Sequence, residues 1–251
     1  MDVTINGARV FFEIPILGGI PITSSLVNAW VVMAVITGLC FWLTRGLTVE
    51  NISKKQAVAE LLVNTCQNFV NGNMGAGYAH FAPFIGALFS LSALCSLSSL
   101  LGAFPATSNL STELAWALLV FGMITYTKIK TNGMGGYLKG FTEPIAVFTP
   151  FNIISELATP ISMAFRHFGN ILSGGVISTL VYAALATASH ALFSLLPGFL
   201  GELLGRIPFL QVGVPAVLSV YFDLFSSLMQ AFIFCMLTML YIANAAQTDD
   251  E

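Results

Sequence analysis

The chain has 251 residues, of which 56% are hydrophobic and only 8% are charged. Soluble globular domains carry about 25% charged residues, so the composition excludes that class and indicates a protein that crosses a membrane several times. The formal net charge is only -3 and no basic run occurs, so we expect no nucleic acid as a partner.

The N-terminal residues 1–23 precede the first long apolar run. They lack the small-residue pattern of a cleavage site, so we expect an external segment and not a cleaved signal peptide. Residues 26–43 are apolar and long enough to be the first membrane span. Basic residues follow this span, and the positive-inside rule therefore puts the next loop in the cytoplasm and the N-terminus outside.

Residues 53–75 repeat apolar side chains at helical spacing opposite a polar face, which predicts an amphipathic helix at the cytoplasmic interface. Residues 81–104 are long enough for a second span, and 105–113 follow as an external loop without Lys or Arg. Residues 111–126 predict a short third span. The segment 127–144 contains three lysines and is expected to be a cytoplasmic loop.

Two apolar stretches, 148–188 and 209–246, make up the C-terminal half. Each has about forty residues, whereas a perpendicular span needs about 20, so helices of this length must tilt strongly. The linker between them is rich in Pro and Gly and predicts an external turn, after which the acidic tail ends in the cytoplasm. We therefore predict an all-α membrane protein with about five membrane helices, the last two forming a long, tilted hairpin.

The C-terminal half carries ionisable and amide side chains that we do not expect in the first three spans. They are Glu156, Arg166, His167, Asn170, Asp223 and Gln230. Arg166 is the most informative, because a guanidinium keeps its proton and costs about 2.5 to 3.5 kcal/mol at the centre of a bilayer. On a helix, Ser162, Arg166 and Asn170 share one narrow face. Asp223 and Gln230 lie near one face of the other stretch.

The residues alone leave several roles open. Arg166 could form a structural ion pair with Glu156 or Asp223, or it could be a fixed cation that faces a mobile carboxylate. Glu156 could instead cap a helix, and Asp223 could make a structural hydrogen bond in place of a water-access role. His167 points to a different helical face from Arg166, so we expect it to pack.

No sequence motif indicates an active site for covalent chemistry. Motifs for phosphate, dinucleotide and zinc binding and the nucleophile elbow are all missing. The four cysteines have no CxxC spacing, so we expect no disulfide, no metal and no cofactor.

Two segments carry a family resemblance. The run PISMAFRHFGNILSGG, followed about sixty residues later by LMQAFIFCMLTMLYIANA, resembles subunit a of the rotary F-type ATP synthase, and the similarity spans nearly the whole chain. The resemblance implies a non-catalytic stator subunit of an enzyme complex in the bacterial plasma membrane. Its implied partners are the lipid bilayer, the c-ring and the peripheral stalk b subunits, and its cargo is H⁺ or Na⁺.

The resemblance also implies roles for individual residues. Arg166 would face the ion-binding carboxylate of the c-ring, with Asn170 and Gln230 as polar neighbours. Glu156 and Asp223 would line two half-channels that lead to opposite sides of the membrane. The chain would then be one membrane domain, with peripheral helices in residues 24–147 and the ion path in 148–251.

One position departs from the family pattern. Many relatives have an acid or histidine where this chain has Gly175, which makes Asp223 the better candidate for the missing acid. The alternative function is an ion-coupled secondary transporter, which would need internal repeats and a site complete within one chain. The sequence does not distinguish H⁺ from Na⁺ as the coupling ion.

Overall fold

The computed structural model describes residues 8–15, 19–49, 52–143, 145–194, 217–218 and 220–246. Within these ranges, 5 helices are long and apolar enough to cross a membrane. This confirms the predicted class of all-α membrane protein. The candidate spans are Ser24–Thr44, Ala76–Leu101, Leu110–Gly140, Ala146–Leu192 and Val220–Ala245.

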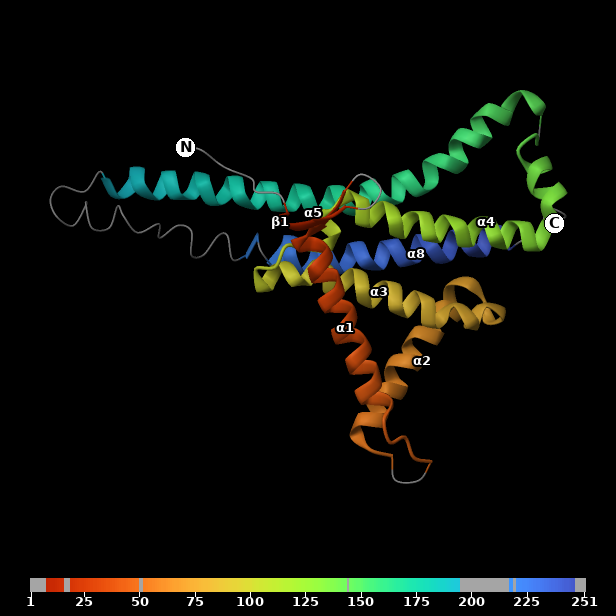
Figure 1. Ribbon diagram of the computed structural model, residues 1–251, viewed down its shortest axis with the longest axis horizontal. Helices are drawn as coiled ribbons and strands as arrows, with labels where there is room; N and C mark the ends of the chain where they lie inside the picture. The colour runs from red at the N-terminus through yellow and green to blue at the C-terminus, as the bar shows by residue number, and fades with distance from the viewer. Residues whose placement is uncertain are drawn as a thin grey trace.

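The first two long helices begin at capped termini. The Thr23 side chain accepts a hydrogen bond at the start of α1 (Ser24–Thr44), and Ser53 does the same for α2 (Lys54–Met74). Figure 1 shows α1 leaving the helix bundle at an angle and α2 returning toward it. Helix α2 matches the predicted amphipathic segment, while its position at the cytoplasmic interface stays a prediction.

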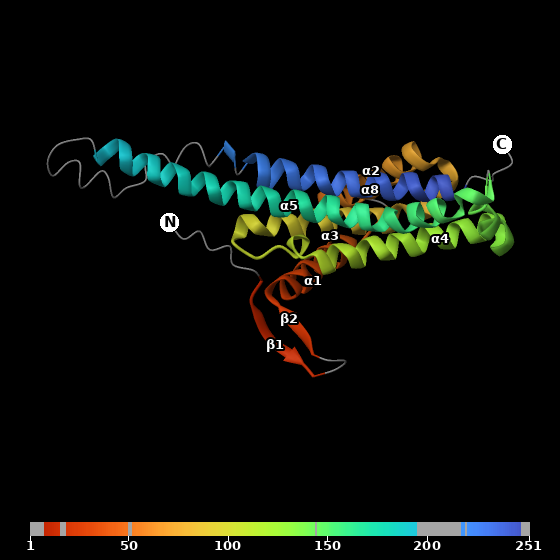
Figure 2. The same ribbon diagram turned by 90° about the horizontal axis from the view of Figure 1, so that it is seen from above.

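A short β-hairpin precedes α1 and was not predicted. Strands β1 (Val10–Ile14) and β2 (Ile20–Thr23) pair antiparallel (Figure 2). β-branched and aromatic side chains favour extended backbone. Strand β1 has the sequence VFFEI, in which every residue except the glutamate is of this kind. The N-terminal segment is therefore an exception to the all-α pattern.

Four helices form the main bundle and run side by side in both views (Figures 1 and 2). They are α3 (Ala82–Leu97), α4 (Leu110–Gly140), α5 (Thr149–Ser194) and α8 (Ser227–Ala245). Their shared core is apolar, and α2 adds side chains at one end. Fully buried members include Val70, Val120, Phe234, Met239 and Ile242.

Short 3-10 segments connect the bundle helices. They are η1 (Ala76–Phe81), η2 (Ser98–Leu101), η3 (Ala106–Ser108) and η4 (Ala146–Phe148). The first two extend α3 at its two ends, which makes the second candidate span longer than α3 alone. The third crosses between α3 and α4 within the predicted external loop.

The predicted loop after the third span is wrong. Helix α4 continues past residue 126 to Gly140, so Lys128 and Lys130 lie on the helix. No proline or glycine interrupts residues 127–132, and the backbone first leaves helical geometry at Gly133, where φ is 72° and ψ is 168°. A single glycine therefore makes a kink within the segment that was predicted to be a loop.

Helix α5 is continuous over 46 residues, with Pro160 inside it, which agrees with the long helix predicted from residue 148. The second predicted stretch is described only from residue 217 onward; its residues 209–216 and Ser219 lie outside the described ranges. Its described part begins with a π-helical segment, η5 (Val220–Ser226), and continues as α8. The strong tilt of this hairpin stays a prediction.

Candidate functional site

The predicted polar stripe lies on an exposed face of α5. Ser162, Arg166 and Asn170 are all exposed, whereas Met163 and Ala164, between them in the sequence, are buried in the bundle core. Helix α5 therefore packs one apolar face into the bundle and leaves the polar stripe, together with apolar residues such as Ile161 and Phe165, open to the outside of this chain.

Arg166 is the charged group of that stripe. Within the described part of the chain, no ion pair or side-chain hydrogen bond reaches its guanidinium; the ion pairs there involve Lys128, Lys139 and His167. Neither Glu156 nor Asp223 is in ion-pair contact with it. The structural ion pair considered from the sequence is thus not formed, and the cation is accessible to a group from another molecule.

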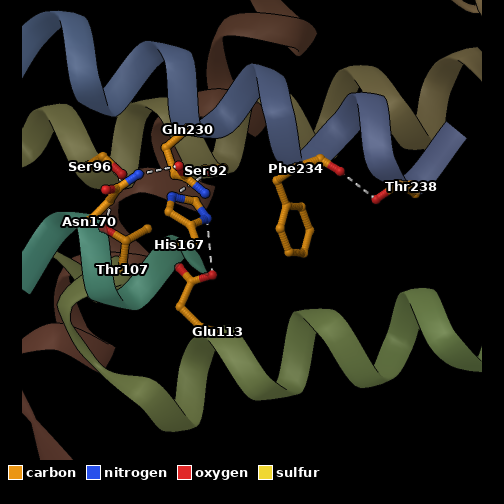
Figure 3. Close-up of polar contacts among 9 residues, drawn as sticks. All are labelled: Ser92, Ser96, Thr107, Glu113, His167, Asn170, Gln230, Phe234 and Thr238. Atoms are coloured by element: carbon orange, nitrogen blue, oxygen red, sulfur yellow. Dashed lines mark hydrogen bonds and ion pairs between the residues drawn. The ribbon is translucent and has the colours of Figure 1, made fainter. Parts of the chain in front are cut away.

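Asn170 and Gln230 join α5 to α8. The Asn170 Nδ2 donates a hydrogen bond of 2.6 Å to the Gln230 Oε1 (Figure 3). Gln230 is only 2% exposed, while Asn170 remains exposed one turn from Arg166. The bond orients an amide at the surface by anchoring it to a buried amide, and it brings together two residues predicted as neighbours in the site.

Glu156 belongs to a separate polar site on α5. Both of its carboxylate oxygens accept hydrogen bonds from Lys128 Nζ of α4, at 2.8 and 2.7 Å. It precedes Arg166 by ten residues, or about 15 Å along a helix. The pair borders a cavity of about 300 Å³. Other polar lining residues are Asn132, Tyr137, Asn152, Ser155 and Asn244.

Asp223 lies in the π-helical segment η5 and is half-buried. It precedes Gln230 by seven residues, or about 10 Å for regular helical rise. Phe222 beside it packs against α5, since a Cβ atom built on Gly174 would come within 3.3 Å of the Phe222 ring. Asp223 is therefore held near the part of α5 that follows Arg166, whereas Glu156 precedes Arg166 on that helix.

A buried polar contact near Arg166 was missed by the sequence analysis. His167 Nδ1 lies 3.1 Å from Glu113 Oε2 of α4, and both side chains are 0% exposed. The His167 Nε2 is 3.4 Å from the hydroxyl of Ser92 on α3 (Figure 3). The expectation that the third span lacks ionisable groups is therefore wrong. An acid at residue 113, next to an apolar run, was the signal available for finding it.

His167 does lie on a different face from Arg166, as predicted. Its ring packs 5.8 Å from the ring of Phe234 on α8. The predicted packing role is incomplete, however, because the same imidazole contacts a carboxylate.

The arrangement suits electrostatic stabilisation of a charged group that approaches Arg166. No group of three or more His, Cys, Asp or Glu side chains that could hold a metal occurs in the described ranges. A permanently charged guanidinium on an exposed helix face can stabilise a carboxylate that approaches it from another protein. Glu156 and Asp223 lie on either side of Arg166, and each carboxylate can attract water along a separate route to it.

Comparison with known proteins places these features in a family. Residues 26–243 match the family model described as ATP synthase A chain. The chain is 32% identical to ATP synthase subunit a 1 of Chlorobaculum parvum, with 93% of each chain covered. It is 30% identical to ATP synthase subunit a 2 of Acaryochloris marina, covering 92% of this chain and 88% of that protein. It is also 30% identical to the sodium ion specific ATP synthase subunit a of Propionigenium modestum, over 90% and 75% of the two chains.

Proposed function

The chain belongs to the ATP synthase A chain family and so to the membrane sector of the F-type ATP synthase, and we propose that it is the stator subunit that translocates the coupling ion. In this proposal Arg166 faces the carboxylate of each c-ring subunit in turn. Two offset half-channels in this chain connect that carboxylate to the two sides of the membrane. Ion flow through them turns the ring and is coupled to ATP synthesis.

One observation carries the proposal: Arg166 stands on an exposed face of a membrane helix without an ion-pair partner in the described chain. An unpaired charge in a bilayer is expensive, so its partner should come from a neighbouring protein. A carboxylate that crosses lipid must be neutral, and it must be charged when it exchanges its ion. A fixed cation favours the charged form at one point of the rotation.

The choice of arginine supports this role. Its guanidinium stays protonated, so it cannot itself pass a proton from one half-channel to the other. Arg166 would therefore release the ion from the ring carboxylate and also block a direct leak. Asn170, held by Gln230, and Ser162 would keep the exposed face polar around the transient ion pair.

The half-channels are assigned to the two flanking carboxylates. Glu156, with its cavity of about 300 Å³, would line the inner half-channel. Asp223 would line the outer one and replace the acid that relatives carry at the position of Gly175. A membrane potential supplies about 2.3 kcal/mol per charge per 100 mV across such a path.

The remaining assignments follow from this role. We place the N-terminus outside and the C-terminus in the cytoplasm of a bacterial plasma membrane, because six basic residues lie in residues 45–55 and in the C-terminal part of α4. Residues 24–147 would be peripheral helices and residues 148–251 the ion path of one domain. The c-ring and the stalk b subunits are the proposed protein partners. No repeat or complete single-chain site favours the alternative of a secondary transporter.

The test is Arg166→Ala in the purified, reconstituted complex. We expect assembly with the c-ring to be unchanged and ATP synthesis under an imposed ion gradient to be abolished. Lys54→Ala, which removes an exposed charge on α2, is the matched control and should synthesise normally. Asp223→Asn should slow ion flow without loss of assembly. Normal synthesis by the assembled Arg166 variant would refute the proposal.

A further inference from the structure

The Glu113–His167 contact is the most deeply buried ionisable pair that the proposed mechanism does not use. The two side chains come from α4 and α5, and each is 0% exposed. Glu113 is in the first turn of α4, where an acid is favoured by the helix dipole. That effect favours an acid at this position, but it does not explain why the carboxylate is turned into the bundle toward an imidazole.

The pair is not a satisfied structural ion pair. Its atoms are at ion-pair distance, but the geometry of the contact is not that of a hydrogen bond, and Glu113 Oε1 has no hydrogen-bond partner among the described residues. Buried carboxylate oxygens are normally hydrogen-bonded by protein or by internal water. A group that keeps a free lone pair in the core is available to accept a proton.

Small hydroxyl side chains line the same region of the bundle. Ser92 Oγ lies 3.4 Å from His167 Nε2, and Ser96 donates a 3.0 Å hydrogen bond to Thr107 of η3 (Figure 3). Both bonds are buried. Thr107 lies in the predicted external connection between α3 and α4. Polar groups therefore occur between that connection and the turn of α5 that carries Arg166.

We propose that Glu113 and His167 form a proton-binding site on the outer access path to Arg166. This proposal rests on the proposed function and adds a residue pair to it. The pair supplies titratable groups near Arg166, which this chain lacks at position 175, where it has a glycine. His167 is adjacent to Arg166 in the sequence and lies on the buried side of the same turn of α5, whereas Arg166 lies on the exposed side.

The chemistry is a simple exchange. When the pair binds a proton, one N–H bond forms on His167 or one O–H bond forms on Glu113, and the net charge of the pair changes from -1 to 0. Release breaks the same bond and passes the proton to water or to the ring carboxylate. The Arg166 cation directly precedes His167 on α5.

This site selects H⁺ over Na⁺. Hard cations are bound by several oxygen ligands, whereas the pair offers one carboxylate, one hydroxyl and an imidazole, which is a proton acceptor. The coupling ion of this chain would then be H⁺, unlike the ion named for the relative from Propionigenium modestum.

The test measures passive ion flux through the reconstituted membrane sector carrying Glu113→Gln, which keeps the size of the side chain and removes its proton exchange. We expect assembly with the c-ring to be normal and H⁺ flux to fall at least tenfold, with Glu113→Asp recovering most of the flux. Glu143→Gln, at an exposed acid just beyond α4, is the matched control and should conduct normally. Radioactive Na⁺ should not pass through any of these preparations.

Each outcome decides the proposal. Unchanged H⁺ flux in the assembled Glu113→Gln complex would overturn it, as would Na⁺ flux through the wild-type membrane sector. If Glu113→Gln does not assemble, the double variant Glu113→Leu/His167→Phe fills the site with apolar groups. That variant should assemble and not conduct; conduction, or a second failure to assemble, would reduce the pair to a structural role. Loss of coupling in Arg166→Ala alongside normal flux in Glu113→Gln would reject this inference and keep the proposed function.

Discussion

Replacing His167 by phenylalanine should strongly destabilise the chain. The Phe side chain has a similar volume and can pack against Phe234, whose ring is 5.8 Å from the imidazole. It leaves the Glu113 carboxylate, which is 0% exposed, without the ion-pair contact that it makes among the described residues. Breaking a buried pair from one side costs about 3 to 5 kcal/mol.

Replacing the other member of the pair, Glu113, should destabilise the chain less. In Glu113→Leu, His167 loses the carboxylate but can stay neutral and keep Ser92 at 3.4 Å from its Nε2. Leaving one neutral polar atom unsatisfied costs about 1 to 3 kcal/mol. In the double variant Glu113→Leu/His167→Phe, both members of the pair are gone and the Ser92 hydroxyl loses only its 3.4 Å contact with the imidazole. Apolar replacement of a buried pair is often nearly neutral or stabilising.

The assay is thermal release of this chain from the purified membrane sector. For a chain of this length, about 1 kcal/mol corresponds to roughly 2 to 4 °C in midpoint. His167→Phe should therefore lower the midpoint by about 6 to 20 °C, and the double variant should lie close to wild type. If the double variant loses as much as the two single variants added together, the residues are not coupled and the reasoning from their contact is wrong.

Three further predictions concern two glycines and one ion pair. Gly174→Leu should destabilise the chain by about 1 to 3 kcal/mol, because a Cβ there already approaches the Phe222 ring to 3.3 Å; thermal release measures the loss. Gly133→Val should cost about 1 to 3 kcal/mol by the same assay, since φ of 72° with ψ of 168° is a region open mainly to glycine. Lys128→Gln and Glu156→Gln should be coupled by about 1 kcal/mol in a double-mutant cycle, because their ion pair is partly buried.

Each of these predictions has a control in the same chain. Gly175→Leu adjoins Gly174 and Gly122→Ala lies on the same helix as Gly133, and a Cβ at either glycine meets nothing within 4 Å. The Lys139–Glu143 pair is exposed, so its cycle should give coupling near zero. Equal losses in a test variant and its control would show that the named contact does not carry the effect.

The five apolar helices were predictable because each is a local property of the chain. Length, hydropathy and the position of basic residues are read along one segment at a time. The exposed stripe of Ser162, Arg166 and Asn170 was predictable for the same reason, since helical spacing alone puts these residues on one face. The continuation of α4 beyond residue 126 was not predictable in this way, because lysines indicate a membrane boundary and not the end of a helix.

The sequence by itself determined that the chain crosses a membrane, that a permanent cation sits in its apolar half, and that it resembles a rotary synthase subunit. Tertiary structure decided which polar groups meet. Glu156 is paired with Lys128, and no ion pair reaches Arg166 among the residues that the structure describes, while Glu113 meets His167 across two helices. Lys128 and Glu156 are 28 positions apart in the sequence, and Glu113 and His167 are 54 positions apart. Whether such residues meet depends on how the helices pack, and the periodicity of a single helix carries no information on that packing.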